Sequence, residues 1–274
     1  MGRPLRELQP GFCYHVTVRC NNREFRLNRV DCKDTLLYAI KKCQDKFDFK
    51  LYGLCIMSNH VHYLLEPRQP DDLPKIMHWL NWYTAMCFNR MLNRTGHFWE
   101  KRYHSSGFPS TDYRRVLNTL RYIHANPNAA DMQSGWFYDF SNYGSYERLT
   151  QDGITEWHPA FLLLGKTLDF CAEAYRQFCE QYRPKPKPER KNRWGSKLLK
   201  RIIEDRKPKK KDKTSPGQLP LKSEELDAMW QVPMDEIREV AREFVRANCY
   251  NPDIAMARFQ QDIGVPGNGS LDGT

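Results

Sequence analysis

Hydrophobic and polar residues recur with clear periods along the first half of the chain. Residues 12–19 alternate apolar and polar side chains, which predicts a half-buried strand. Residues 31–47 repeat apolar positions at helical spacing, with Asp31 or Asp34 as the expected N-cap. Residues 51–57 and 60–66 then predict two antiparallel strands joined by a tight turn at Ser58 and Asn59.

The following stretch completes one domain. A second helix is expected to start within residues 71–74 and to continue through residue 91, and a strand with a loop is expected within residues 97–109. A third helix, capped by Ser110, Thr111 or Asp112, is expected to end before Pro127, because a residue preceding proline disfavours the helical backbone. The order β-α-β-β-α-β-α predicts an α+β, ferredoxin-like fold, an antiparallel sheet covered by helices on one face.

The pattern divides the chain into five predicted segments. Residues 1–150 form the main domain, 151–183 a helical extension, 184–216 a basic linker rich in proline and lysine, 217–265 a small helical unit, and 266–274 a disordered tail. The net charge is +10, and residues 184–216 alone hold fourteen Lys or Arg against four Asp or Glu. Such a concentrated charge attracts nucleic acid, although a solubilising linker has the same composition.

Composition narrows the class of protein. A chain of 274 residues that is 40% hydrophobic and 13% aromatic can build a sizeable core. No apolar run is long enough to cross a membrane and the N-terminus lacks a signal-peptide core, so we expect a cytoplasmic protein without a membrane partner. The nine cysteines include no CxxC pair, which favours reduced, buried thiols over disulfides or a zinc site.

Two histidines suggest a metal site. His60 and His62 are two residues apart on a predicted strand, so both point to the same side and can bind one divalent ion through neutral imidazole nitrogens. The pattern is short and eight histidines are present, so two structural histidines are an equally good interpretation.

The third predicted helix offers a nucleophile beside these histidines. Tyr122 and Asn126 are one turn apart on the side opposite the apolar positions, so a phenol and an amide oxygen are presented together, the latter acceptable to Mg²⁺ or Mn²⁺. A packing tyrosine and a helix-ending asparagine would give the same pattern. Other tyrosines lack a suitable ligand four residues later or, as Tyr138 and Tyr143, lie in a segment whose composition predicts a loop.

Four motifs carry a family resemblance. They are MSNHVHYLLEP, NRTGHFWEKRYHS, LRYIHANPNAADM and FSNYGSY, and they occur in this order within residues 10–148. Together they resemble the single-tyrosine HUH transposases, most closely the REP-associated tyrosine transposases. The sequence departs from many relatives at Ser58, where they have proline, and at residues 124–131, which read HANPNAAD where relatives commonly read HLNPVRAGL.

The resemblance implies a fold, a reaction and a set of site residues. It implies a ferredoxin-like core with the histidine strand in the middle of the sheet, His60, His62 and Asn126 as ligands of Mg²⁺ or Mn²⁺, and Tyr122 as the nucleophile. Members of this family cut and rejoin single-stranded DNA next to imperfect hairpins, through a 5′-phosphotyrosine.

DNA contacts are predicted where cations lie among aromatic residues. A charged groove with aromatic side chains suits single-stranded DNA, although a solvated charged face explains the same residues. The predicted contacts are Arg19, Asn21, Asn22, Arg94, Lys101, Arg102 and Arg115.

Two alternative functions stay open. One is a catalytically silent hairpin-binding regulator, and the other is a rolling-circle initiator or relaxase. The sequence leaves monomer or homodimer undecided.

Overall fold

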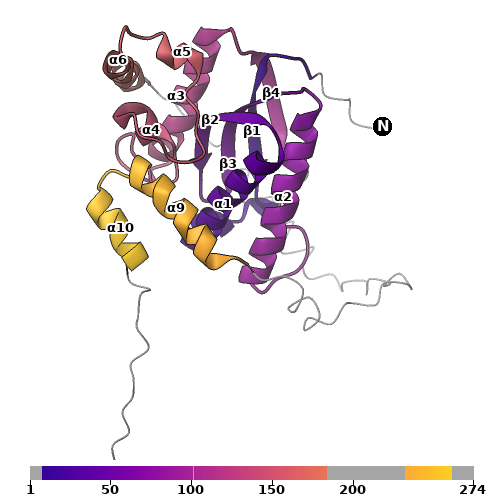
Figure 1. Ribbon diagram of the computed structural model, residues 1–274. Helices are drawn as coiled ribbons and strands as arrows, with labels where there is room; N and C mark the ends of the chain where they lie inside the picture. Colours follow the sequence, from indigo (N-terminus) through magenta and orange to yellow (C-terminus); the bar gives the residue numbers. More distant parts are fainter. Residues whose placement is uncertain (1–7, 101, 184–231, 261–274) are drawn as a thin grey trace, which may run out of the picture. The chain divides into compact units, whose positions relative to one another are not determined.

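The computed structural model describes residues 8–100, 102–183 and 232–260 (Figure 1). The predicted basic linker 184–216, the predicted tail 266–274, the first part of the predicted helical unit and Lys101 lie outside these ranges. All elements described below belong to one unit, made of the chain up to Tyr182 and from Pro233 onward. Within the described residues, no helix combines the length and the apolar character needed to span a membrane.

Four strands form one antiparallel sheet. They are β1 (Phe12–Arg19), β2 (Phe49–Ile56), β3 (His60–Pro67) and β4 (His104–Pro109), in the spatial order β2-β3-β1-β4. The alternating residues of the sequence therefore form strands where the period of two predicts them. The strand that carries the two histidines lies inside the sheet between β2 and β1, and the α+β ferredoxin-like prediction is confirmed.

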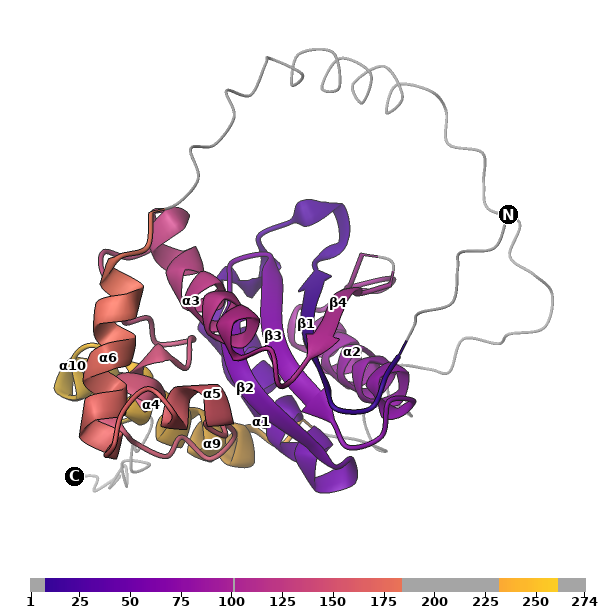
Figure 2. The ribbon, with the colours of Figure 1, turned by 90° about the horizontal axis from the view of Figure 1, so that it is seen from above.

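Helices cover both faces of this sheet, whereas the sequence interpretation placed them on one face. Figure 2 shows α1 (Val30–Lys46) and α2 (Asp72–Met91) on one side and α3 (Tyr113–Ala129) on the other. Gly53 of β2 allows α3 to come close, since a Cβ there would lie 3.0 Å from Leu120 and 3.2 Å from Ile123. Leu120 and Ile123, from the predicted apolar stripe of α3, are fully buried.

The ends of two helices differ from the prediction. The N-cap of α1 is Arg29, and Asp31 lies inside the first turn, where its carboxylate pairs with Arg29. Asp112 caps α3 as expected, but the helix continues past Pro127 to Ala129. Proline removes the N–H that would bond to the carbonyl of Ile123, and the side chain of Asn126 donates to that carbonyl at 3.5 Å instead.

Short helices follow, starting in a segment predicted to be a loop. This segment forms α4 (Tyr143–Arg148). The next helices along the chain are α5 (Pro159–Leu162) and α6 (Leu168–Glu180). Two 3-10 turns, η1 (Asn21–Arg23) and η2 (Arg26–Asn28), lie between β1 and α1. Tyr143 packs its ring against those of Phe137 and Tyr175 and is 1% exposed, so aromatic packing forms the helix despite the polar, glycine-containing sequence.

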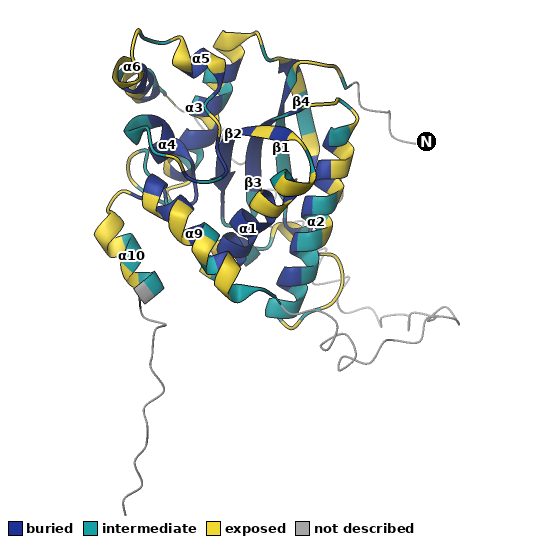
Figure 3. Ribbon diagram, in the orientation of Figure 1, coloured by how far each residue is buried: buried dark blue, intermediate teal, exposed yellow. Residues whose placement is uncertain are grey.

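The two C-terminal helices pack against the sheet domain. Helix α9 (Met234–Asn248) contacts α1 and α4, and α10 (Pro252–Gln260) contacts α9. Ile237 and Phe244 of α9 are fully buried, while the outer faces of the helices stay exposed (Figure 3). Tyr38 of α1 donates to Glu236 at 2.7 Å, and Arg258 of α10 forms two bonds to Asp34. All nine cysteines are buried and free, as predicted.

Candidate active site

A buried hydrogen-bond network fixes the helix that carries Tyr122. Nε2 of His124 on α3 lies 2.9 Å from Oδ1 of Asn142, which also accepts from the backbone N–H of Leu54 on β2 at 2.7 Å. Nδ1 of His124 lies 2.8 Å from the Tyr175 hydroxyl. Both His124 and Asn142 are fully buried. The network therefore ties α3 to the sheet and to α6 at the position next to Tyr122.

The predicted histidines and tyrosine come together on the α3 face of the sheet. The rings of His60 and His62 lie 4.9 Å apart, centroid to centroid, and Tyr122 stands edge-on to His62 at 5.8 Å. Tyr122 lies equally close, at 5.8 Å, to His15 on β1, a histidine that the sequence interpretation did not select. Side chains from two adjacent strands and one helix thus meet at one place.

The hydrogen bonds of both histidines leave the same ring nitrogen for a ligand. Nδ1 of His60 lies 2.7 Å from the amide oxygen of Asn59, so it carries the proton, and Nε2 keeps its lone pair. Nδ1 of His62 lies 3.0 Å from Nε2 of His15 and 3.3 Å from the Thr17 hydroxyl. Nε2 of His62 is buried and has no hydrogen-bond partner within the part of the chain that the structure describes. A divalent metal ion fits this pair of nitrogen donors.

The electrostatic surroundings keep these rings neutral. Burial, followed by the charge of Arg19, lowers the pKa of His60 to about 4. Burial, followed by the neighbouring His60, His15 and Arg19, lowers the pKa of His62 well below its usual value. Neutral imidazoles are the form that binds metals, so the fold holds the histidines in the ligand state.

Asn126 is turned so that its oxygen faces away from its own helix. Its Nδ2 donates to the carbonyl of Tyr122 at 2.8 Å and to that of Ile123 at 3.5 Å. The C-terminal end of α3 lies near the start of β3, since Met132 just beyond the helix is 3.7 Å from Ser58 in the turn before His60. The end of α3 that carries Asn126 therefore lies near the His60 end of β3.

A pocket opens beside the tyrosine. Its volume is about 470 Å³, and it is lined by His15, Asp112, Arg114, Arg115, Asn118, Thr119 and Tyr122. Tyr122 is 43% exposed, whereas His62 is 5% exposed. The tyrosine is therefore accessible to a large substrate while the histidine beneath it is shielded from water.

The predicted DNA contacts fall into two groups. Arg19 pairs in register with His60, and Arg115 lines the pocket and lies over the ring of Phe108, so both border the site. Asn21 and Asn22 lie in the η1 turn that follows β1. Just before this turn, the backbone N–H of Cys20 donates to the carbonyl of Asn59.

The other predicted cations lie elsewhere along the chain. Arg94 bonds to Asn89 and to the carbonyl of His97, so it is engaged within its own loop. Arg102 is exposed just before β4. Lys101 belongs to the residues that the structure does not describe.

Three residues of the site were missed from the sequence. His15 and Thr17 lie on the polar side of β1, in the same alternation that predicted the strand, and Asn59 immediately precedes His60. The alternation placed His15, Thr17 and Arg19 on one face, but it could not show that this face adjoins β3. The pairing of Thr17 with His62 is a property of the sheet order.

The competing tyrosines are excluded by burial. Tyr138 and Tyr143 are 8% and 1% exposed, so neither phenol can reach a DNA phosphate. The reasoning from the sequence excluded Tyr143 because a loop was expected there, and that reason is wrong, since Tyr143 begins α4.

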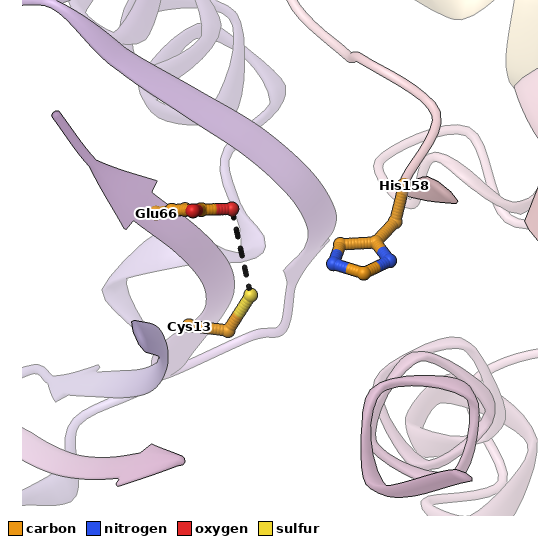
Figure 4. A group of neighbouring side chains, drawn as sticks. All are labelled: Cys13, Glu66 and His158. Carbon is orange, nitrogen blue, oxygen red and sulfur yellow. Dashed lines mark hydrogen bonds between the residues drawn. The ribbon is translucent and has the colours of Figure 1, made fainter. Parts of the chain in front are cut away.

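A second cluster lies further along β1 and β3. Cys13, Glu66 and His158 bring one potential ligand atom each within 4.8 Å of one another (Figure 4). The Glu66 carboxylate already accepts from the hydroxyls of Tyr52 and Ser110. Nδ1 of His158 accepts from the backbone N–H of Ala160, so a neutral ring carries its proton on Nε2, the nitrogen turned toward the cluster. Glu66 is half-buried, and a protonated Nε2 of His158 facing its carboxylate offers no lone pair to a metal ion.

Comparison with known proteins gives a match over the first half of the chain. Residues 9–126 match the family model described as transposase, IS200-like. No curated protein matches.

Two solved structures are similar over about half of the chain. One is a REP-associated tyrosine transposase bound to a REP hairpin, with 21% identity, a TM-score of 0.43, and coverage of 53% of this chain and 85% of that one. The other is a candidate transposase from Deinococcus radiodurans R1, with 17% identity, a TM-score of 0.30, and coverage of 45% and 97%.

Proposed function

We propose that this protein is a metal-dependent single-stranded DNA endonuclease and strand transferase with Tyr122 as its nucleophile. The observation that supports this most is the meeting of Tyr122 with His62 and His15 at 5.8 Å, on the sheet face beside an open pocket. The match of residues 9–126 to a transposase family model supports DNA as the substrate.

The metal would be held by His60 and His62 through Nε2, with Asn126 as a third ligand through its amide oxygen. This donor set of two imidazoles and one amide accepts Mg²⁺ or Mn²⁺. When bound, the ion polarises the scissile phosphate and offsets the charge that develops on its oxygens.

Tyr122 then performs the covalent step. Its phenol oxygen attacks phosphorus and loses its proton, while the bond from phosphorus to the 3′ oxygen breaks and that oxygen takes up a proton. The products are a 5′-phosphotyrosine and a free 3′-hydroxyl. Because the phosphodiester is conserved in the link to Tyr122, a second 3′-hydroxyl can reverse the step and join strands without ATP.

The substrate would approach over the cationic side of the site. Arg19 and Arg115, which border the site, would contact backbone phosphates, and Asn21 and Asn22 in the turn after β1 would add contacts. The resemblance of the motifs to REP-associated transposases makes single-stranded DNA with imperfect hairpins the proposed substrate. The main domain within residues 1–150 carries this site, and the basic residues 184–216 would add phosphate contacts.

A trapping experiment separates this proposal from a silent hairpin-binding regulator. Protein, Mg²⁺ and a labelled hairpin oligonucleotide are mixed, and a denaturing gel is searched for a covalent adduct. Wild type should form the adduct, and Tyr122→Phe should bind the DNA equally well without forming it. Tyr113→Phe is the matched control, since Tyr113 is similarly exposed at the start of the same helix, at 40%. An equal amount of adduct from Tyr122→Phe would disprove the assignment, and DNA binding without any adduct from wild type would favour the regulator.

A further inference from the structure

We propose that His15 is a positioning residue that selects the metal-binding tautomer of His62. The inference rests on the proposed function, because it concerns the same metal site. His15 lies on β1, whereas His60 and His62 lie on β3, and its proposed role is to accept a hydrogen bond, not to bind the ion.

The short contact between the two rings allows only one shared proton. Nε2 of His15 and Nδ1 of His62 are 3.0 Å apart, with the rings stacked at 5.2 Å, so one nitrogen donates and the other accepts. If His15 donates, the proton of neutral His62 lies on Nε2. If His62 donates, Nε2 of His62 keeps a lone pair.

Burial decides between the two arrangements. Nε2 of His62 is buried and has no partner among the described residues, so a proton there would be a buried donor without an acceptor. The same nitrogen with a lone pair is ready for a metal. With His15 accepting, His62 matches His60, whose Nδ1 faces the oxygen of Asn59. Both histidines then keep a lone pair on Nε2 for the proposed ion and hold Nδ1–H in a hydrogen bond.

The sheet fixes the backbone position of His15. It is directly paired with Ser106 of β4 on one side and Leu64 of β3 on the other, in the middle of the sheet. Thr17 provides only a longer contact to His62 Nδ1, at 3.3 Å, and a hydroxyl that can also donate. Loss of His15 would therefore leave Nδ1 with a weaker and less selective partner.

The test measures metal binding directly. Mn²⁺ affinity of the DNA-free protein is determined by calorimetry for wild type, His15→Leu and His15→Gln. The leucine variant removes the acceptor, and the glutamine variant can place an amide oxygen where Nε2 of His15 lies. Loss of a hydrogen-bond partner behind a metal ligand typically weakens affinity about 10- to 100-fold, so His15→Leu should fall in this range and His15→Gln should recover most of the loss.

Tautomers give a second readout and a control. In metal-free protein labelled with ¹⁵N-histidine, NMR should show His62 protonated on Nδ1 in wild type and a mixture of tautomers in His15→Leu. His104→Leu removes an exposed histidine from β4, opposite Thr17, and should leave both Mn²⁺ affinity and the His62 tautomer unchanged.

Three results would overturn the inference. They are wild-type Mn²⁺ affinity in His15→Leu, a glutamine variant as weak as the leucine variant, and His62 protonated on Nε2 in the wild-type protein. The first two leave the proposed function intact, since Mn²⁺ still binds to wild type. A wild-type protein that binds no Mn²⁺ in the presence or absence of DNA would instead contradict the proposed metal site.

Discussion

Replacing Asn142 by alanine tests how the Tyr122 helix is held. The side-chain oxygen of Asn142 accepts from the N–H of Leu54 and from Nε2 of His124, and its amide donates to the carbonyl of Tyr52. After substitution the Tyr52 carbonyl still accepts from the Tyr146 hydroxyl, but the two donors of Leu54 and His124 lose their acceptor. Each buried donor without a partner costs about 1–3 kcal/mol, so the free energy of unfolding should fall by about 3–5 kcal/mol.

Urea unfolding followed by circular dichroism measures this loss, and a double-mutant cycle identifies its source. His124→Phe removes one of the two orphaned donors, so the double variant should be more stable than the sum of the single losses predicts, by about 1–2 kcal/mol. A loss below about 1 kcal/mol in Asn142→Ala, or additive losses in the cycle, would refute the reasoning. Because α3 carries Tyr122, covalent adduct formation should also slow in the folded variant.

Three further predictions concern acidity, the C-terminal helices and the basic segment. Burial lowers the pKa of His124 to about 4, so the unfolded chain binds more protons than the folded protein between pH 6.5 and 4. The free energy of unfolding should therefore decrease as the pH is lowered through this window. Between pH 7.5 and 5.5 this histidine should account for about 1 kcal/mol, seen as a smaller pH dependence of urea midpoints in His124→Gln. Truncation after residue 232 should lower the melting temperature sharply, because Ile237, Phe244 and Val245 are buried against the domain, whereas Glu236→Gln should have little effect. Replacing six of the fourteen Lys or Arg in residues 184–216 by Gln should weaken binding to hairpin DNA and reduce the slope of log affinity against log salt, and an unchanged slope would show that these cations do not contact phosphates.

The strands and long helices could be predicted because their signals are local. Alternation over residues 12–19 and helical spacing over 113–126 each lie within one element, and the structure places β1 and α3 there. Pro127 misled the prediction because the rule that proline ends helices assumes an unsatisfied carbonyl. Here Asn126 donates to that carbonyl, a compensation that depends on side-chain geometry.

The parts that could not be predicted depend on contacts between distant segments. The structure of α9 follows from its sequence, but its packing on α1 joins residues about 200 positions apart, as in the bond from Tyr38 to Glu236. In the sequence, Asn142 belongs to the FSNYGSY motif. Its hydrogen bonds to β2 and α3 show that it has a structural role. The composition predicted a loop there because it does not reveal the aromatic packing around Tyr143.

In the candidate site, too, some features follow from local sequence and others depend on distant segments. The spacing of His60 and His62 predicts that both rings share a side, and their ring separation of 4.9 Å agrees with that. Which nitrogen of each ring is free depends on the partner of the other nitrogen, and for His62 that partner is 47 residues away on another strand. A short motif can therefore place two imidazoles on one side of a strand, but the sheet order determines the partners of their ring nitrogens. Under the proposed metal assignment, the chemistry of His60 and His62 depends on β1 as much as on β3, the strand that carries them.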